Sequence, residues 1–322
     1  MSRIRVGVLR GGPSSEYDVS LKTGASVLKH LPEEKYEGIE IFIDREGVWH
    51  IKGRPYDPGR ALSQVDVAFN AMHGEYGEDG TVQRILESFN IPYTGSNSLS
   101  SAVAMNKHRA KEVAERSGIK VARGLVLGVS EDLDQRVYEI FRTFPQPAVI
   151  KPIASGSSVG VSIARSYDQL TDGIRHAFNY SPKILIEEYI PGREATIGVL
   201  NHFRGEEVYV MLPIEIIPPT TCSFFDYTAK YGGQTQELCP GNFSRDVKTE
   251  LARAAKAIHQ ALGLRHYSRS DFIVSPRGVY FLEVNTLPGL TEQSLLPKAL
   301  AAGGTSFGDF LDHLVELALS RR

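Results

Sequence analysis

The sequence has little of several features that mark particular protein classes. Only two of its 322 residues are cysteines, Cys222 and Cys239, and they lack the CxxC spacing of a metal or redox site. This scarcity indicates free thiols in a reducing compartment. No apolar stretch is long enough to cross a bilayer, and MSRIRVGVLRGG runs into a predicted strand rather than a signal peptide. We therefore expect a cytoplasmic chain with no membrane partner.

Common nucleotide and nucleic-acid signatures are also missing. The formal net charge is −2 and no basic run is present, so we expect no nucleic-acid partner. The segment GGPSSE after the first predicted strand lacks the third glycine of the dinucleotide fingerprint GxGxxG. No GxxxxGK[ST] motif occurs, which excludes a Walker-type nucleotide site.

The N-terminal third has the pattern of an α/β unit. A strand over Ile4–Leu9, a glycine turn and a helix over Val19–His30 are followed by a strand over Val65–Met72. In an open sheet of this kind, ligands bind beyond the carboxyl ends of the strands. Glu16 and the loop HGEYGEDG, which begins at His73, follow two such ends. A solvated loop acid is the alternative interpretation of Glu16.

At 322 residues the chain is too long for one simple core and predicts two or three domains. Further predicted elements are a helix over Ser98–Ser117, strands over Pro147–Lys151, Val161–Ala164, Lys183–Tyr189, Ala195–Leu200 and Val208–Ile217, and helices over Lys248–Leu262 and Phe307–Leu319.

One predicted hairpin concentrates oxygen-bearing side chains on a single face. Its strands are Ser268–Val274 and Val279–Asn285. With residues 276–278 as the loop, Asp271 lies opposite Glu283, and directly opposite residues share a face. That face carries Arg269, Asp271, Glu283 and Asn285. The core-facing set is then Phe272, Val274, Tyr280, Leu282 and Val284.

Two carboxylates and an amide oxygen on one face form a hard-oxygen site. Such sites suit Mg²⁺ or Mn²⁺, and Mg²⁺ usually shares its coordination with substrate phosphates. Taken alone, the hairpin fits a surface ion pair equally well.

Two loops have compositions that are typical of binding sites. Residues 154–160, ASGSSVG, follow Lys151, and their backbone N–H groups suit phosphate oxygens, although a flexible hairpin is the alternative. Residues 220–240 form a long loop that predicts a lid or binding loop, with Lys230 and Tyr231 just before two glycines.

Eight motifs in order resemble the ATP-grasp enzymes, and among them the D-alanine–D-alanine ligase family, over the whole length. They are GGPSSEYDVSL, HGEYGEDGTVQ, MNKHRAK, VIKPIASGSSVGV, IEEYIPGRE, FFDYTAKY, SRSDF and LEVNTLPGLTEQSL. The implied fold class is α/β, specifically the α+β ATP-grasp fold. We expect an N-terminal open parallel sheet domain over residues 1–97, then two ATP-grasp subdomains with antiparallel sheets over 98–187 and 188–322.

The resemblance also implies site residues. It assigns ATP to Lys107, Lys151, Ser158, Glu187, Glu188, Tyr189, Ile190, Glu194 and Lys230. It assigns two Mg²⁺ or Mn²⁺ ions to Asp271, Glu283 and Asn285. It assigns catalysis and substrate binding to Glu16, His73, Ser157, Tyr231, Arg269, Gly289, Ser294 and Leu295. It implies a homodimer and leaves open whether a monovalent cation is needed.

The implied reaction joins two D-alanines into D-alanyl-D-alanine through an acyl phosphate, releasing ADP and phosphate, for peptidoglycan precursors. Alternatives are a ligase with D-serine or D-lactate as second substrate, and a non-catalytic ATP-binding regulator. Tyr231 is the residue type that accompanies amino-acid acceptors in this family. Departures from the family pattern are Asn106 in place of Asp, Ser155 in place of Glu, and Ser268 and Ser270 within the motif GRxD.

Overall fold

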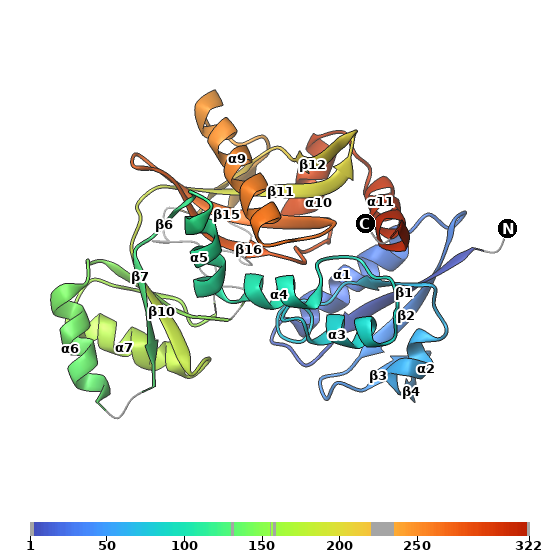
Figure 1. The fold of residues 1–322 in the computed structure, drawn as a ribbon, viewed down its shortest axis with the longest axis horizontal. Helices are drawn as coiled ribbons and strands as arrows, with labels where there is room; N and C mark the ends of the chain where they lie inside the picture. Colours follow the sequence, from blue (N-terminus) through green and yellow to red (C-terminus); the bar gives the residue numbers. More distant parts are fainter. Residues whose placement is uncertain (1–2, 130–131, 155, 157–158, 220–234, 321–322) are drawn as a thin grey trace.

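A computed structural model describes residues 3–129, 132–154, 156, 159–219 and 235–320. Within them the chain forms three β-sheets with flanking helices (Figure 1). The α/β fold class expected from the sequence is confirmed, with parallel strands in the first sheet and mainly antiparallel strands in the other two.

The first sheet has the order β4-β3-β2-β1-β5, and β1 is parallel to both β2 and β5. Its elements are β1 (Ile4–Gly11), α1 (Tyr17–His30), β2 (Tyr36–Ile43), β3 (Trp49–Ile51), β4 (Arg54–Tyr56), α2 (Pro58–Leu62), β5 (Val67–Asn70) and α3 (Thr81–Ser88). Because β1 and β5 are parallel neighbours, the loops that follow them emerge side by side. Ser20 ties these loops together, accepting from Gly11 N at 2.8 Å and donating to Ala71 O at 3.0 Å.

The second sheet is antiparallel, with the order β7-β10-β8-β9. The elements of this part are α4 (Ser98–Met105), α5 (Lys107–Arg116), β6 (Lys120–Val121), β7 (Gly124–Gly128), α6 (Leu133–Thr143), β8 (Ala148–Pro152), β9 (Ser162–Ala164), α7 (Tyr167–Phe178) and β10 (Lys183–Glu188). Helices α6 and α7 pack on this sheet, as Figure 1 shows, through Ile140 and Ile174 against Ile150 and Ile184.

The single helix predicted over Ser98–Ser117 is wrong, because two helices meet at Asn106. This residue has an extended backbone, with φ −82° and ψ 100°. Its side chain accepts from Arg109 N at 3.1 Å and so caps α5. The break places Lys107 in the first turn of α5. Its backbone N–H donates to the carbonyl oxygen of Ile153, which directly follows β8.

The third sheet has the order β14-β13-β11-β15-β16-β6, and β12 pairs with β11. Its elements are β11 (Arg193–Phe203), β12 (Glu206–Val210), β13 (Ile214–Ile217), β14 (Gln236–Leu238), α9 (Arg245–Ala261), β15 (Tyr267–Ser275), β16 (Gly278–Asn285), α10 (Leu295–Ala302) and α11 (Phe307–Ser320). The prediction of one continuous strand over Val208–Ile217 is wrong, because two strands, β12 and β13, cover this range. Pro213, which has no backbone N–H, lies between them.

The β15–β16 hairpin has the predicted polar face and a different turn. Asp271 pairs with Glu283 as predicted, but Ser275 pairs with Gly278, so the three-residue loop is wrong. A β-bulge at Leu282 absorbs the difference and shifts the register between Asp271 and Phe272.

The bulge changes which side chains enter the core. Phe281 is fully buried and packs with Phe272, at 5.9 Å between ring centroids. The predicted core positions Tyr280 and Leu282 instead lie in a separate small cluster with Ile273. The core prediction for these two residues is therefore wrong, while Phe272 and Val284 are buried as expected.

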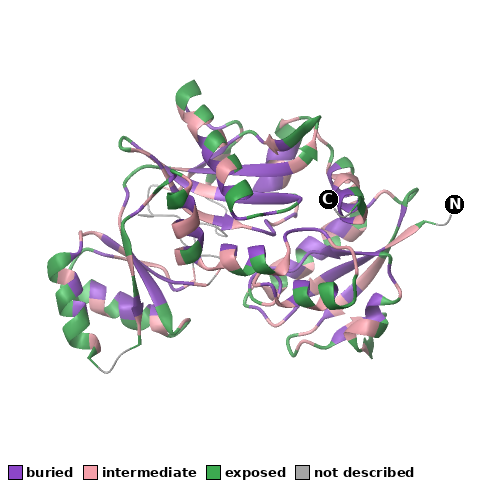
Figure 2. Cartoon of the chain, viewed as in Figure 1, coloured by how far each residue is buried: buried purple, intermediate pink, exposed green. Residues whose placement is uncertain are grey.

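Burial follows the sheets (Figure 2). The C-terminal helix α11 contributes Phe310 and Leu314 to a cluster that contains Val6 and Phe69 of the first sheet and Tyr267 of β15. This cluster fixes the first sheet against the third. No helix among the described residues is long and apolar enough to cross a membrane.

A buried histidine supports the start of β15. His259 on α9 bonds through Nδ1 to Ser268 Oγ at 2.7 Å and through Nε2 to Asn201 Oδ1 at 3.1 Å. Burial, aided by the positive charge that His266 can carry, lowers the pKa of His259 to about 4.

We expect His259 to contribute to loss of stability in acid. The unfolded chain binds this proton below a pKa of about 6.5 and the folded chain only near 4, so the free energy of unfolding falls as pH drops through that window, by up to about 3 kcal/mol. Denaturant unfolding between pH 4 and 7.5 should give a flatter pH dependence for His259→Gln. The exposed-site control His176→Gln should keep the wild-type slope, and an equal slope in the His259 variant would contradict this role.

Candidate active site

Two adjoining cavities lie where the three sheets meet. The larger, about 610 Å³, is lined by the loops after β1 and β5, the α4–α5 junction, β15, β16 and the segment that leads into α10. The smaller, about 180 Å³, lies between the second and third sheets. Four residues line both: Lys107, Arg269, Glu283 and Leu295. The cavities therefore meet at a cation-rich junction with one carboxylate.

The smaller cavity has apolar walls and a charged end. The walls include Ala122, Val149, Ile163, Ile190, Ile216, Ile273 and Leu282. The polar lining comprises Lys107, Lys151, Glu187, Glu188, Tyr189, Glu194, Arg269, Asp271 and Glu283. An apolar slot with a few directed polar groups is the usual form of a small-molecule site, and cations at one end suit a ligand that carries an aromatic base and phosphates.

A buried carboxylate holds two lysines at the charged end. Lys151 Nζ lies 2.6 Å from Glu187 Oε2, and Lys111 Nζ donates to the other oxygen of the same carboxylate. Burial opposes charge in this group, but the two ammonium groups outweigh it and lower the pKa of Glu187, which in turn raises the pKa of Lys151. For Lys111 burial dominates and lowers the pKa to about 8.

The oxygen-bearing face of the hairpin converges as the sequence predicted. Asp271 accepts from Arg269 Nη2 at 2.9 Å, Asn285 Nδ2 at 3.2 Å and Thr196 Oγ1 at 2.5 Å. Glu283 lies 3.1 Å from Lys107 Nζ.

No group of three or more His, Cys, Asp or Glu residues gathers as a metal site in the described part of the chain. The set here is two carboxylates and an amide, which are hard oxygen donors that fit Mg²⁺ completed by water or phosphate oxygens.

Arg269 lies at the junction of the two cavities. It is buried, and its guanidinium forms a two-point contact with Asp271, at 3.0 Å from Nε and 2.9 Å from Nη2. Burial would lower its pKa, but the neighbouring carboxylate outweighs it and raises the pKa of Arg269. The junction therefore keeps a fixed positive charge.

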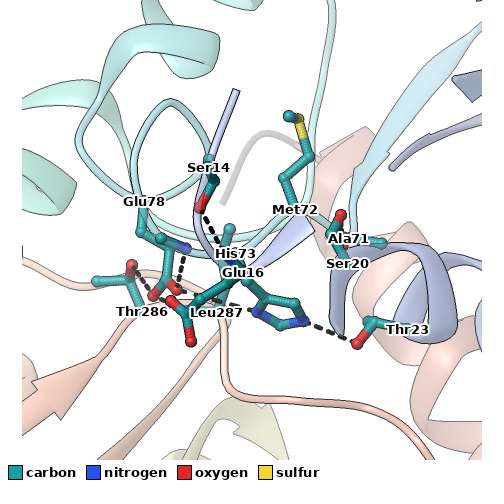
Figure 3. A network of polar contacts seen from close by, with 12 residues as sticks. Ser14, Glu16, Ser20, Thr23, Ala71, Met72, His73, Glu78, Thr286 and Leu287 are labelled. Atoms are coloured by element: carbon teal, nitrogen blue, oxygen red, sulfur yellow. Dashed lines mark hydrogen bonds and ion pairs between the residues drawn. The ribbon is translucent and has the colours of Figure 1, made fainter. Parts of the chain in front are cut away.

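A polar network lines the larger cavity beside the first sheet (Figure 3). His73 bonds through Nε2 to Thr23 Oγ1 at 2.7 Å, and its Nδ1 lies 3.9 Å from Glu78 Oε1. Glu16, at the start of α1, lines the same cavity. Burial and the nearby Glu16 carboxylate raise the pKa of Glu78 to about 7.

The segment after β16 forms the opposite wall. Ser294, the N-cap residue of α10, accepts from Thr291 N at 3.1 Å and lies 2.8 Å from Thr291 Oγ1. Gly289 and Leu295 line the cavity with it. A Cβ built on Gly289 would lie 2.9 Å from Ser294 Oγ, so the backbone approaches closely at this point.

The structure brings the described candidates together around these two cavities. Those lining the larger are Glu16, His73, Lys107, Arg269, Glu283, Asn285, Gly289, Ser294 and Leu295. Those lining the smaller also include Lys151, Glu187, Glu188, Tyr189, Ile190, Glu194 and Asp271. Ser157, Ser158, Lys230 and Tyr231 lie outside the described residues.

Sequence reasoning did not single out three polar residues of this site. Lys111 lies four residues after Lys107 on the same helix, a spacing that would have indicated a shared face. Glu78 was one of four ionisable side chains in a glycine-rich loop. Thr196 had no local signal, because its contact depends on the pairing of β11 with β15.

Sequence comparison with known proteins covers almost the whole chain. A family model described as "D-ala D-ala ligase C-terminus" matches residues 113–316, and the corresponding N-terminal model matches residues 5–57 and 52–96. The D-alanine–D-alanine ligase of Syntrophobacter fumaroxidans is 41% identical, with 98% of each chain covered. That of Geobacter sulfurreducens is 42% identical, with 97% of this chain and 93% of the relative covered.

Comparison with solved structures points to the same family as the sequence comparison. The VanG D-Ala:D-Ser ligase from Enterococcus faecalis has a TM-score of 0.86 at 31% identity, with 98% of this chain and 100% of that chain covered. The D-alanine–D-alanine ligase from Bacillus anthracis has a TM-score of 0.80 at 33% identity, with 99% and 98% covered, and a second structure of that enzyme is complexed with ATP. With both family models matched and relatives above 40% identity over nearly its full length, this chain belongs to the D-alanine–D-alanine ligase family and has its ATP-grasp fold.

Proposed function

We propose that this protein is an ATP-dependent ligase that joins two D-alanines into D-alanyl-D-alanine through an acyl phosphate, releasing ADP and phosphate, for peptidoglycan precursor synthesis. The observation that carries the proposal is the cavity junction, where Arg269 and Lys107 line both a polar cavity and an apolar slot. A site of this form can hold a nucleotide's terminal phosphate against an amino-acid carboxylate.

ATP occupies the smaller cavity in this proposal. Ile190, Ile273 and Leu282 supply apolar walls for the base. Glu187, Glu188, Tyr189 and Glu194 line the base and ribose region, with Glu194 on the ribose hydroxyls. Lys107 and Lys151 hold the α- and β-phosphates, while Ser158 and Lys230 join by resemblance to the family.

Two Mg²⁺ or Mn²⁺ ions are proposed at Asp271, Glu283 and Asn285, whose donor atoms fit them. When bound, the ions neutralise the charge of the phosphates during transfer. Arg269 pairs with Asp271 and Lys107 with Glu283, so cationic side chains lie beside both carboxylates. We also propose a cytoplasmic homodimer and the division at residues 1–97, 98–187 and 188–322.

In the first half-reaction Glu16 receives the ammonium group of the first D-alanine, with His73 beside it. The carboxylate of this first D-alanine is then directed toward the γ-phosphate of ATP at the junction of the two cavities. Transfer breaks the bond between the γ-phosphorus and its bridging oxygen and forms an acyl phosphate. The lysines contribute charge stabilisation and positioning, which is the main demand of phosphoryl transfer.

In the second half-reaction the neutral amine of the second D-alanine attacks the acyl carbon and forms the C–N bond. Collapse of the tetrahedral intermediate breaks the bond from that carbon to the phosphate oxygen, so phosphate leaves and the nitrogen loses one proton. Arg269 and the Gly289 N–H stabilise the tetrahedral oxyanion, and preorganised donors of this kind supply much of the rate enhancement in acyl transfer. Ser294 and Leu295 receive the acceptor carboxylate. Ser157 and Tyr231, with Glu16, bring their loops over the site and exclude water.

A second candidate function differs in the acceptor. The Enterococcus faecalis VanG enzyme, with a TM-score of 0.86, is a D-Ala:D-Ser ligase, so D-serine is the first alternative second substrate and D-lactate is the next. A non-catalytic ATP-binding regulator is disfavoured, because Lys107, Lys151 and Arg269 are retained and lie together.

Substrate choice can be tested with the purified protein. The purified protein with ATP and Mg²⁺ should release phosphate with D-alanine alone, because one amino acid fills both subsites. Mixtures of D-alanine with D-serine or D-lactate, with products separated by mass spectrometry, should yield mainly D-alanyl-D-alanine. Phosphate release that requires D-serine would contradict the acceptor assignment, and none with any substrate would contradict ligase activity.

A double substitution tests the metal ligands. Asp271→Asn with Glu283→Gln removes two carboxylates while keeping side-chain size, and we expect turnover to fall by at least about 10³-fold, since the phosphates lose their bound cations. Glu188→Gln makes the same type of change in the same cavity but leaves the proposed metal ligands intact, and it should lose far less. Turnover close to wild type in the double variant would refute the proposed site.

The acceptor preference depends on Tyr231 in this proposal. Tyr231→Phe removes one hydroxyl, and we expect the ratio of D-alanyl-D-lactate to D-alanyl-D-alanine to rise, because the hydroxyl belongs to the set that favours an amine acceptor. Competition assays at pH 6 to 9 measure this ratio directly. An unchanged ratio across that range would count against the role of Tyr231.

A further inference from the structure

The carboxylate of Glu78 bridges two loops from opposite ends of the chain. Its Oε1 accepts from Gly74 N at 3.1 Å within the loop after β5. Its Oε2 accepts from Leu287 N at 3.1 Å and from Thr286 Oγ1 at 3.3 Å in the segment after β16 (Figure 3). One side chain therefore spans the wall between the first and third sheets.

The loop that carries Glu78 is itself firmly held. Gly77 O accepts from Asn70 Nδ2 at 3.1 Å and from Gln83 Nε2 at 2.8 Å, both buried. The backbone N–H of Glu78 donates to Gly74 O at 2.8 Å. The carboxylate is thus a fixed anchor, and the segment that it grips takes its position from it.

The gripped segment leads directly to the proposed oxyanion donor. Leu287, whose N–H binds Glu78, is two residues before Gly289. Gly289 approaches Ser294 closely, and Ser294 N donates to Thr291 O at 2.9 Å. A displacement at Leu287 would therefore move the Gly289 N–H, and an oxyanion donor is effective only within a few tenths of an ångström of its optimal distance.

The same carboxylate also faces His73, which belongs to the same loop. His73 Nε2 bonds to Thr23 Oγ1, and its Nδ1 faces Glu78 Oε1. The hydrogen bond to Thr23 holds the ring, and the Glu78 carboxylate lies within ion-pair range of its Nδ1. Glu78 is thereby linked to both the wall of the first D-alanine subsite and the wall that stabilises the oxyanion.

A direct catalytic role fits Glu78 less well than a positioning role. Its two oxygens already accept from three donors, and its side chain is only 12% exposed. The charged groups that act on it from other elements are Glu16 and Arg269.

We propose that Glu78 is a positioning residue that sets the Gly289 loop against the first D-alanine subsite. This inference rests on the proposed ligase function and adds to it a residue that does not touch the reacting groups. Its failure is distinguishable, because wild-type protein that forms the dipeptide establishes the function independently.

Glu78→Gln is the first test. Glutamine keeps the size but turns one acceptor into a donor that faces a backbone N–H, so one of the two loops must move. We expect kcat to fall on the order of 10²-fold, as for loss of one oxyanion donor, with KM for ATP unchanged within about twofold. Glu78→Asp, which reaches only one loop, should show the same pattern.

The two half-reactions separate positioning from general damage. With D-alanine and ATP labelled with ¹⁸O in the β,γ bridge, reversible phosphoryl transfer moves label into non-bridging β positions. We expect Glu78→Gln to retain a larger fraction of this scrambling than of dipeptide formation, because the oxyanion arises only in the second step.

Glu87→Gln is the matched control. Glu87 also accepts from three donors, Tyr93 Oη at 2.6 Å, Ser98 N at 3.0 Å and Ser98 Oγ at 2.7 Å, and lines neither cavity. We expect it to keep wild-type kcat.

Three results would overturn the proposal. They are kcat within about threefold of wild type in folded Glu78 variants, equal losses of scrambling and dipeptide formation, and failure of both variants to fold, since Glu78 would then support the fold rather than the reaction.

Discussion

The site depends on the antiparallel pairing of β15 with β16. Asp271 lies opposite Glu283 and Arg269 opposite Asn285, so four polar groups share one face. The bulge at Leu282 lets this polar register coexist with a buried Phe272–Phe281 pair on the opposite face. A slip of one residue would place a carboxylate in the core, and the cost of burying an unpaired charge enforces the register.

Charge balance makes such a polar centre tolerable inside the protein. Glu187 pairs with both Lys151 and Lys111, Glu283 faces Lys107, and Asp271 holds Arg269. Buried pairs of this kind add little net stability, but loss of one partner is strongly destabilising. In the proposed function, Lys107 and Lys151 would hold the phosphates, and Asp271, Glu283 and Asn285 would hold the divalent ions that neutralise phosphate charge.

Local sequence patterns predicted much of the hairpin and of the family assignment. Alternation across two strands gave the opposing pair Asp271 and Glu283, and the motif order indicated the family that the comparisons support. The features that the sequence did not predict depend on contacts between residues that are distant in the sequence or on packing in the core. Asn106 ends one helix by capping the next, and the bulge at Leu282 follows from packing of Phe281 rather than from composition. Glu78 accepts from the Thr286 hydroxyl and the Leu287 N–H, both more than 200 residues away, and no local pattern contains these contacts.

The central claim is that the polar face of the hairpin holds divalent ions against a nucleotide's phosphates. Anomalous diffraction from crystals grown with Mn²⁺, a non-hydrolysable ATP analogue and D-alanine tests it directly. We predict manganese peaks within coordination distance of Asp271, Glu283 and Asn285, with the phosphates on the far side of the ions beside Lys107 and Lys151. Manganese located elsewhere, or a nucleotide outside the slot between the second and third sheets, would contradict the account.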